Sequence, residues 1–239
     1  MQPYEAFNIP TSCAIGNVIP KKHFYANYNF STNDKKLFAS INKIYWLYSL
    51  KPATINIPPY KDEERDYPEI EFLEVVLSCD TNLRRAAEII MRAIPYPMVL
   101  IFRLDQKVQI WTAHQRLNQA DSSKNTIEDF VFTQWLEPTD QLFSRLDIRN
   151  MRFTNYFDLY TDLVDEISIY NAECATGENS LTGEEARELT RKIDMLERQL
   201  ASLRAALKKE SQFNKKVELN IKIKQLESTK LSLLQGGSI

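Results

Sequence analysis

Hydrophobic side chains recur at helical spacing in three segments of the first 170 residues. Residues 31–50 open with Ser and Thr capping candidates and then place apolar residues three or four positions apart, which predicts one amphipathic helix that Pro52 ends. Residues 81–94 show the same spacing and stop at Pro95. Residues 152–168 show it again, with apolar residues alternately four and three positions apart. Each segment therefore predicts a helix with one buried face.

Strand-like patterns fill the intervals between these helices. Alternating or continuous apolar runs predict five strands, at residues 53–57, 69–78, 97–104, 107–117 and 128–136. Alternation in the second run predicts an edge strand whose glutamates face solvent. The third run is apolar throughout, as in a central strand buried on both faces. Only two residues separate it from the fourth run, which predicts a hairpin.

The order of these elements predicts an α+β fold in which helices pack on a mixed sheet. We assign this core domain to residues 1–170. Residues 171–181 have no apolar periodicity and predict a linker. Residues 182–235 have a strongly helical pattern and predict a C-terminal antiparallel helical hairpin, a short coiled coil.

Two features define the start and the seam of the C-terminal helical segment. Thr182 followed by Glu185 has the spacing of a capping box, so the first helix should begin there. Beyond it, five leucines and one isoleucine alternate at intervals of four and three, a pattern that two helices bury against each other. The predicted seam comprises Leu189, Ile193, Leu196, Leu200, Leu203 and Leu207.

The seam breaks where the sequence reads "KKESQFNKK". A straight continuation would bring Glu210, Asn214 and Lys224 into the seam, so one helix cannot keep a single register. A second apolar stripe follows, formed by Leu219, Ile223, Leu226 and Leu233, with Phe213 and Val217 near its start. We predict two helices folded back on each other with a tip at residues 209–214. A long helix that changes register and forms a homodimer is the alternative.

Composition narrows the class of protein. The chain has 239 residues, of which 44% are hydrophobic, enough for a sizeable core. The net charge of -2 does not suit a protein that coats nucleic acid, but residues 181–239 hold 12 Lys and Arg against 8 Asp and Glu and form the basic part. Three scattered cysteines and the lack of a long apolar run predict a cytoplasmic protein with no disulfide framework and no membrane partner.

Motifs for common active sites are missing. Two histidines, His23 and His114, give no metal-binding or catalytic pattern, and five glycines leave no phosphate-binding loop. We therefore expect no resident metal and no cofactor. Three carboxylates in and beside residues 69–78 loosely resemble a restriction-type Mg²⁺ nuclease centre, although the lysine of such a centre is missing. They are Glu69, Glu71 and Glu74. The hypothesis favoured for them is a solvated acidic face, and a divergent nuclease is the alternative.

Lysine pairs are the other candidate contacts. Most lysine pairs on helices lie on solvated faces, but four lysines within nine residues flank the predicted hairpin tip and could contact a partner or a phosphate backbone. The candidate contact residues are Lys21, Lys22, Lys208, Lys209, Gln212, Phe213, Asn214, Lys215 and Lys216. The alternative for Gln212 and Phe213 is that they only fix the end of the hairpin.

Six segments together carry a resemblance to a known family: "IPKKHFYANY", "KPATINIP", "RAIPYPMVLIF", "KVQIWTAHQRL", "FTQWL" and "QFNKKVELNIKIKQLE". In this order, along nearly the whole chain, they resemble the bacterial and archaeal domain of unknown function 4391. The resemblance implies no assigned activity. It implies that such proteins accompany DNA methyltransferases and helicases in restriction-like or phage-defence gene clusters. The positions that resemble the family are Pro20, Lys21, Lys22, Tyr25, Pro95, Trp135, Gln212, Phe213, Asn214, Lys216, Glu218, Leu219 and Asn220.

These observations predict an interaction protein rather than an enzyme. We expect a non-catalytic accessory subunit that docks a helicase or a DNA methyltransferase through the hairpin. Direct DNA contact and a homodimer stay open as further possibilities. The nuclease is the alternative from a different class.

Overall fold

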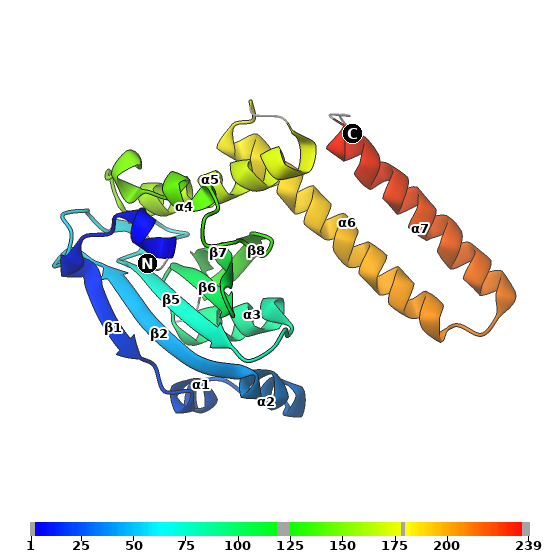
Figure 1. Cartoon of the computed structure of the whole chain (residues 1–239), viewed down its shortest axis with the longest axis horizontal. Coiled ribbons are helices and arrows are strands. Elements are labelled where there is room, and N and C mark those ends of the chain that lie inside the picture. Colours follow the sequence, from blue (N-terminus) through cyan, green and yellow to red (C-terminus); the bar gives the residue numbers. More distant parts are fainter. Residues whose placement is uncertain (1–2, 119–124, 178–179, 236–239) are drawn as a thin grey trace. The chain divides into compact units, whose positions relative to one another are not determined.

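The computed structural model describes residues 3–118, 125–177 and 180–235. Its internal contacts divide the chain into two compact units, Met1–Ile167 and Ser168–Ile239. The first unit contains the sheet, and the second contains two long helices (Figure 1). The predicted α+β class is confirmed.

A six-stranded mixed sheet forms the centre of the first unit. Its strand order is β1-β2-β5-β6-β7-β8. The strands are β1 (Ala14–Val18), β2 (Ile41–Leu50), β5 (Ile70–Leu77), β6 (Met98–Leu104), β7 (Lys107–Leu117) and β8 (Asn125–Phe132). Only β5 and β6 run parallel among neighbours, because α3 (Leu83–Ala93) carries the chain back between them. The short strands β3 (Tyr60–Lys61) and β4 (Asp66–Tyr67) form a separate pair.

Different elements cover the two faces of this sheet. On one face, α1 (Lys22–Asn27), α2 (Thr32–Ala39) and α3 enclose a core that includes Phe38 and Phe102. The other face carries the 3-10 helix η1 (Pro3–Phe7), α4 (Leu142–Arg145) and the first part of α5 (Tyr156–Thr176). There the fully buried Tyr160 hydroxyl donates to the Met98 carbonyl oxygen at 2.8 Å. Both faces of the central strands are therefore buried.

The predicted single helix at residues 31–50 is wrong in its second half. Helix α2 ends at Ala39, and residues 41–50 form β2. The segment is rich in Ile, Tyr and Trp, which favour strands, and it pairs with a neighbour on each side. Two register irregularities in its pairing with β5 place apolar residues at spacings that imitate a helix. Tertiary pairing has overridden the local pattern.

Three strand predictions also need correction. Residues 53–57 form no strand: residues 52–54 make a turn with a bend at residue 55, and the Thr54 hydroxyl donates to the Ser49 carbonyl oxygen at 2.9 Å. β5 is a central strand and not an edge strand, so Glu71 and Glu74 are buried and do not face solvent. The strand expected at residues 128–136 begins three residues earlier and ends at Phe132. The strands at 97–104 and 107–117, and the hairpin that they form, are confirmed.

Helix α5 covers more of the chain than its apolar spacing indicates. It begins after Phe153, which is exposed, and continues to Thr176. Residues 171–176, expected to belong to the linker, are therefore helical. Residues 178 and 179 of that segment lie outside the described part of the chain.

The second unit contains the predicted hairpin of α6 (Gly183–Lys209) and α7 (Phe213–Leu234). Thr182 and Glu185 form the capping box, with the Thr182 amide donating to the Glu185 carboxylate at 2.9 Å. Two ion pairs link the helices, Glu197 with Lys230 and Arg204 with Glu227. The higher number on one helix pairs with the lower on the other, so the helices are antiparallel, with a tip at residues 210–212. Among the described residues, no helix has the length and hydrophobicity needed to cross a membrane.

Candidate functional site

Two glutamates are buried on the central strand β5, and they lie on opposite faces of the sheet. The pairing of β5 with β6 is regular from Glu71 to Val76, so side chains alternate strictly between the faces. Glu71 shares its face with Leu73, while Glu74, three positions along, faces the other way. Glu71 and Glu74 are 1% and 3% exposed. A sequence pattern of glutamates on one strand has therefore produced two separate environments.

The Glu74 carboxylate receives hydrogen bonds and a neutralising positive charge from residues of its own unit. Its Oε1 accepts hydrogen bonds from the Tyr4 hydroxyl at 2.8 Å and from Arg103 Nε at 2.6 Å. Burial and the adjacent Glu74 carboxylate raise the pKa of Tyr4 well above its usual range, so its hydroxyl stays a donor. The guanidinium charge balances the buried carboxylate, as a stable buried pair requires. Glu74 has the environment of a structural residue.

Glu71 has hydrogen-bond donors but, among the described residues, no ion-pair partner. Its Oε2 accepts from Trp46 Nε1, and its Oε1 accepts from the Ser49 hydroxyl at 3.0 Å. Within the described residues, no ion pair reaches this carboxylate. Burial raises the pKa of Glu71 to about 7, and the two hydrogen bonds only partly oppose that rise. The group is thus poised to gain or lose a proton near neutral pH.

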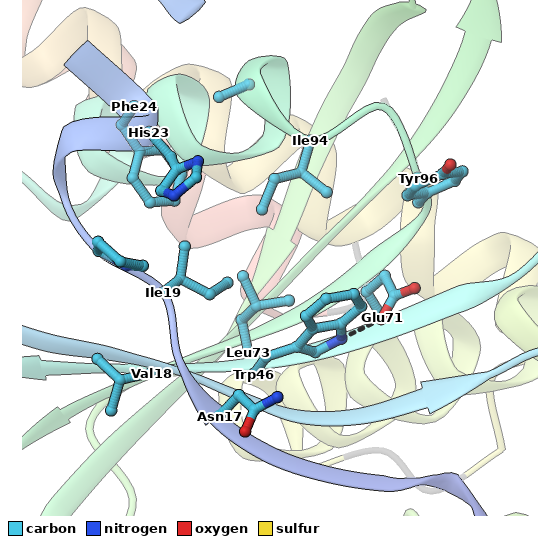
Figure 2. Close-up of a pocket in the computed structure, with 12 residues that line it drawn as sticks. Asn17, Val18, Ile19, His23, Phe24, Trp46, Glu71, Leu73, Ile94 and Tyr96 are labelled. Atoms are coloured by element: carbon cyan, nitrogen blue, oxygen red, sulfur yellow. Dashed lines mark hydrogen bonds between the residues drawn. The ribbon is translucent and has the colours of Figure 1, made fainter. Parts of the chain in front are cut away.

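A cavity of about 440 Å³ opens beside Glu71. Four separate stretches of sequence supply its walls: positions within residues 17–24, from β1 into α1; Trp46 on β2; Glu71 and Leu73 on β5; and positions within residues 93–96, from the end of α3 into the connection to β6. Figure 2 shows Ile94 and Leu73 directed toward each other across it, with the Trp46 indole alongside and Tyr96 at one side. The carboxylate of Glu71 lies next to this indole, to which the dashed line joins it.

The three candidate nuclease carboxylates do not converge. Glu69 precedes β5, and Glu71 and Glu74 project to opposite faces. Among the described residues, no group of three or more His, Cys, Asp or Glu side chains is arranged to hold a metal ion. Carboxylates on opposite faces of the sheet cannot coordinate the same Mg²⁺ ion. The geometry therefore lends no support to the nuclease alternative.

Lys21 and Lys22, the N-terminal candidate contacts, have different environments. Lys21 Nζ donates to the carbonyl oxygens of Phe38 at 3.0 Å and Ile41 at 2.7 Å. It thereby satisfies backbone acceptors where α2 ends and β2 begins. Lys22 is exposed on α1. Lys21 thus has an intramolecular role that the sequence did not indicate.

The predicted seam faces the inside of the hairpin to different depths. Leu200 on α6 and Ile223 on α7 are buried, at 4% and 7% exposure. The other seam residues are half-buried: Leu189, Ile193, Leu196, Leu203 and Leu207. The groove between the helices is lined by Leu200 and Leu234 and is bordered by the two interhelical ion pairs. A pair of helices alone buries only one side of each.

The hairpin tip is open to solvent. The candidate contact residues there are all exposed: Lys208, Lys209, Gln212, Phe213, Asn214, Lys215 and Lys216. Phe213 is 77% exposed, so it does not fix the hairpin by burial. Glu210 holds the loop instead, because its Oε1 accepts from the amides of Ser211 at 2.8 Å and Gln212 at 2.9 Å.

Helix α7 also carries a row of exposed apolar side chains, separate from the stripe formed by Leu219, Ile223, Leu226 and Leu233. Phe213, Val217 and Ile221 are four residues apart, which places them on one side of the helix, and Val217 and Ile221 are 41% and 51% exposed. In the sequence pattern, Phe213 and Val217 stood near the start of the stripe formed by Leu219, Ile223, Leu226 and Leu233, but both are exposed. We call Phe213, Val217 and Ile221 the outer stripe. Their regular spacing of four was the signal that could have found it.

Comparison with known proteins gives one match. The family model described as a domain of unknown function (DUF4391) matches residues 7–229. The chain belongs to the DUF4391 family. The match includes every strand of the sheet, the Glu71 cavity and nearly all of the hairpin, so the DUF4391 domain comprises both units. No curated protein and no solved structure matches the chain.

Proposed function

We propose that this protein is a non-catalytic accessory subunit that docks a protein partner through the outer stripe of its hairpin. The exposed outer stripe is the observation that carries the proposal. The partner suggested by the family resemblance is a helicase or a DNA methyltransferase subunit of a cytoplasmic restriction-like or phage-defence complex.

The outer stripe suits a protein surface. Apolar side chains at intervals of four on an exposed helix are the usual anchors of a helix that binds in a groove. Phe213 offers the largest of them, and aromatic residues are enriched among the anchors of interfaces. Each anchor is already held by α7, so docking costs little backbone entropy.

The charges at the tip narrow the chemistry of the partner. Lys208, Lys209, Lys215 and Lys216 lie next to the start of the outer stripe and are all exposed. A complementary surface would have an apolar groove with an acidic rim, since opposite charges at a rim steer association. The lysines also support a secondary proposal of DNA contact, which predicts binding that falls steeply as salt is raised.

The decisive experiment uses the purified full-length chain and purified candidate helicase and methyltransferase subunits from the same organism. Light scattering after size exclusion would measure a complex with each candidate, after nuclease treatment to remove bridging DNA. The test variant is V217D/I221D, which places two carboxylates on the outer stripe. The matched control is Q199D/S202D, which adds the same charge at exposed positions of α6.

We expect one candidate to form a complex that the control variant keeps and the test variant loses. Equal binding by the two variants would overturn docking through the stripe. Failure of both candidates to bind would overturn the choice of partner. A wild-type homodimer that V217D/I221D converts to a monomer would assign the stripe to self-association and also overturn the proposal.

A further inference from the structure

The Glu71 cavity lies in the first unit and has no part in docking through the hairpin. We propose that it binds a small organic cation, an amine with an aromatic or aliphatic substituent, whose ammonium group donates to the Glu71 carboxylate. The size, the walls and the charge of the cavity each support this ligand class.

The walls of the cavity are mainly apolar and aromatic. Trp46, Leu73 and Ile94 line it, together with Tyr96 at one side (Figure 2). Its volume of about 440 Å³ falls within the range of about 300–1,000 Å³ that is usual for small-molecule sites. Aromatic rings also attract a cation placed over their faces. The walls therefore suit an organic substituent with a positive head group.

The charge of the cavity favours a cation over an anion or a neutral molecule. Among the described residues that line it, none is lysine or arginine, and Glu71 is the one carboxylate. On the other face of the same strand, Arg103 forms an ion pair with Glu74, whereas among the described residues Glu71 forms no ion pair. A buried carboxylate is costly until a positive charge joins it. A bound ammonium would supply that charge.

Glu71 also has acceptor capacity left. An ionised carboxylate offers about four lone-pair sites, and Trp46 and Ser49 occupy two. An ammonium group has three donors and no acceptor, so it matches the remaining acceptor sites. A ligand that offers only acceptors would form no hydrogen bond with the carboxylate and would be repelled by its negative charge.

Other charged and titratable groups lie around this carboxylate. Glu69 raises the pKa of Glu71 and Lys51 lowers it, each by less than burial does. His23 and Tyr96 line the cavity from α1 and from the α3–β6 connection. Lys51 makes no ion pair with Glu71 among the described contacts, so it leaves the site for a ligand cation open.

Benzylamine and benzyl alcohol are suitable probes, because they share a ring and differ in charge. Binding to the full-length chain at pH 8 would be followed by NMR through the Trp46 indole signal, assigned with W46F. We expect benzylamine to bind at least about tenfold tighter than benzyl alcohol, since a charge-assisted hydrogen bond replaces a neutral one. E71Q should remove this preference while still binding the alcohol.

A second variant guards against loss of the fold. I94W should fill the cavity and abolish the binding of both probes, while circular dichroism shows that each variant stays folded. Equal affinity of the wild type for the two probes would overturn the proposal. So would a preference for benzylamine that persists in E71Q, or a lack of any signal change with either probe. None of these results depends on a docking partner.

Discussion

The two faces of β5 give a buried glutamate different environments, one with an ion-pair partner and one with neutral hydrogen-bond donors. Glu74 meets Arg103 and Tyr4, so its charge and its hydrogen bonds are satisfied within the unit. Glu71 meets Trp46 and Ser49, which donate hydrogen bonds but bring no charge, and a cavity opens beside it. The difference teaches that burial alone does not distinguish a structural carboxylate from a binding one; the countercharge does.

Helix α7 repeats this contrast in apolar form. Ile223 packs inside the hairpin at 7% exposure, whereas Ile221, two residues earlier, is 51% exposed. On β5, Glu74 forms an ion pair within the chain, whereas among the described residues Glu71 does not. On α7, Ile223 is buried within the hairpin, whereas Ile221 is exposed. We assign a ligand to the Glu71 cavity and a protein partner to the outer stripe, and variants on the two sides should therefore behave differently.

The largest effect is expected from breaking the completed pair. R103M should leave Glu74 buried without its cation and lower the free energy of unfolding by about 3–5 kcal/mol. Urea denaturation would measure this loss. The control R92M removes a half-exposed arginine that pairs with Glu88, and it should cost less than about 1 kcal/mol. Similar losses in the two variants would contradict a structural role for the Glu74 pair.

The next largest effect is that of pH on the contribution of Glu71 to the free energy of unfolding. The pKa of Glu71 rises from its usual 4.5 to about 7 on folding, so its contribution to stability is intact below pH 4.5 and is lost as pH rises to 7. The total loss is about 3 kcal/mol at one pKa unit per 1.4 kcal/mol. E71Q should lack this loss, so its stability relative to the wild type should increase over that range. Parallel pH curves for the two proteins would refute the assignment.

A smaller effect separates the two stripes of the hairpin. L200A removes a buried seam side chain and should cost about 2–3 kcal/mol. I221A removes an exposed one and should change stability by less than about 0.5 kcal/mol. Hydrogen exchange of the α6 and α7 amides would report both. Equal protection in the two variants would mean that the outer stripe is buried in solution.

The smallest effect concerns the ion pairs across the hairpin. Lys230 and Glu197 have side chains that are 28% and 51% exposed, so water and salt screen their attraction. K230A should therefore change the free energy of opening of the hairpin, measured by amide hydrogen exchange, by less than about 1 kcal/mol. A loss as large as that of L200A would show that charge, rather than the seam, holds the hairpin together.

Prediction from sequence succeeded where the pattern was long or the signal was local. The capping box at Thr182, the hairpin and the α+β class all followed from spacing. It failed at residues 41–50, where pairing on both sides of β2 overrode a helical pattern. It also placed Glu71 in solvent, because the alternating pattern of residues 69–78 is typical of an edge strand, whereas β5 lies in the centre of the sheet. The Glu71 cavity could not be predicted, since its walls come from four separate stretches of sequence.

The most direct test of the account is a titration of the Glu71 carboxyl carbon by ¹³C NMR, assigned with E71Q, with and without benzylamine. We predict a midpoint near pH 7 for the protein alone, because burial without a countercharge favours the protonated form. Benzylamine should lower this midpoint by stabilising the carboxylate. A midpoint near 4.5, unchanged by benzylamine, would contradict the claim that Glu71 is a buried carboxylate that binds a ligand cation.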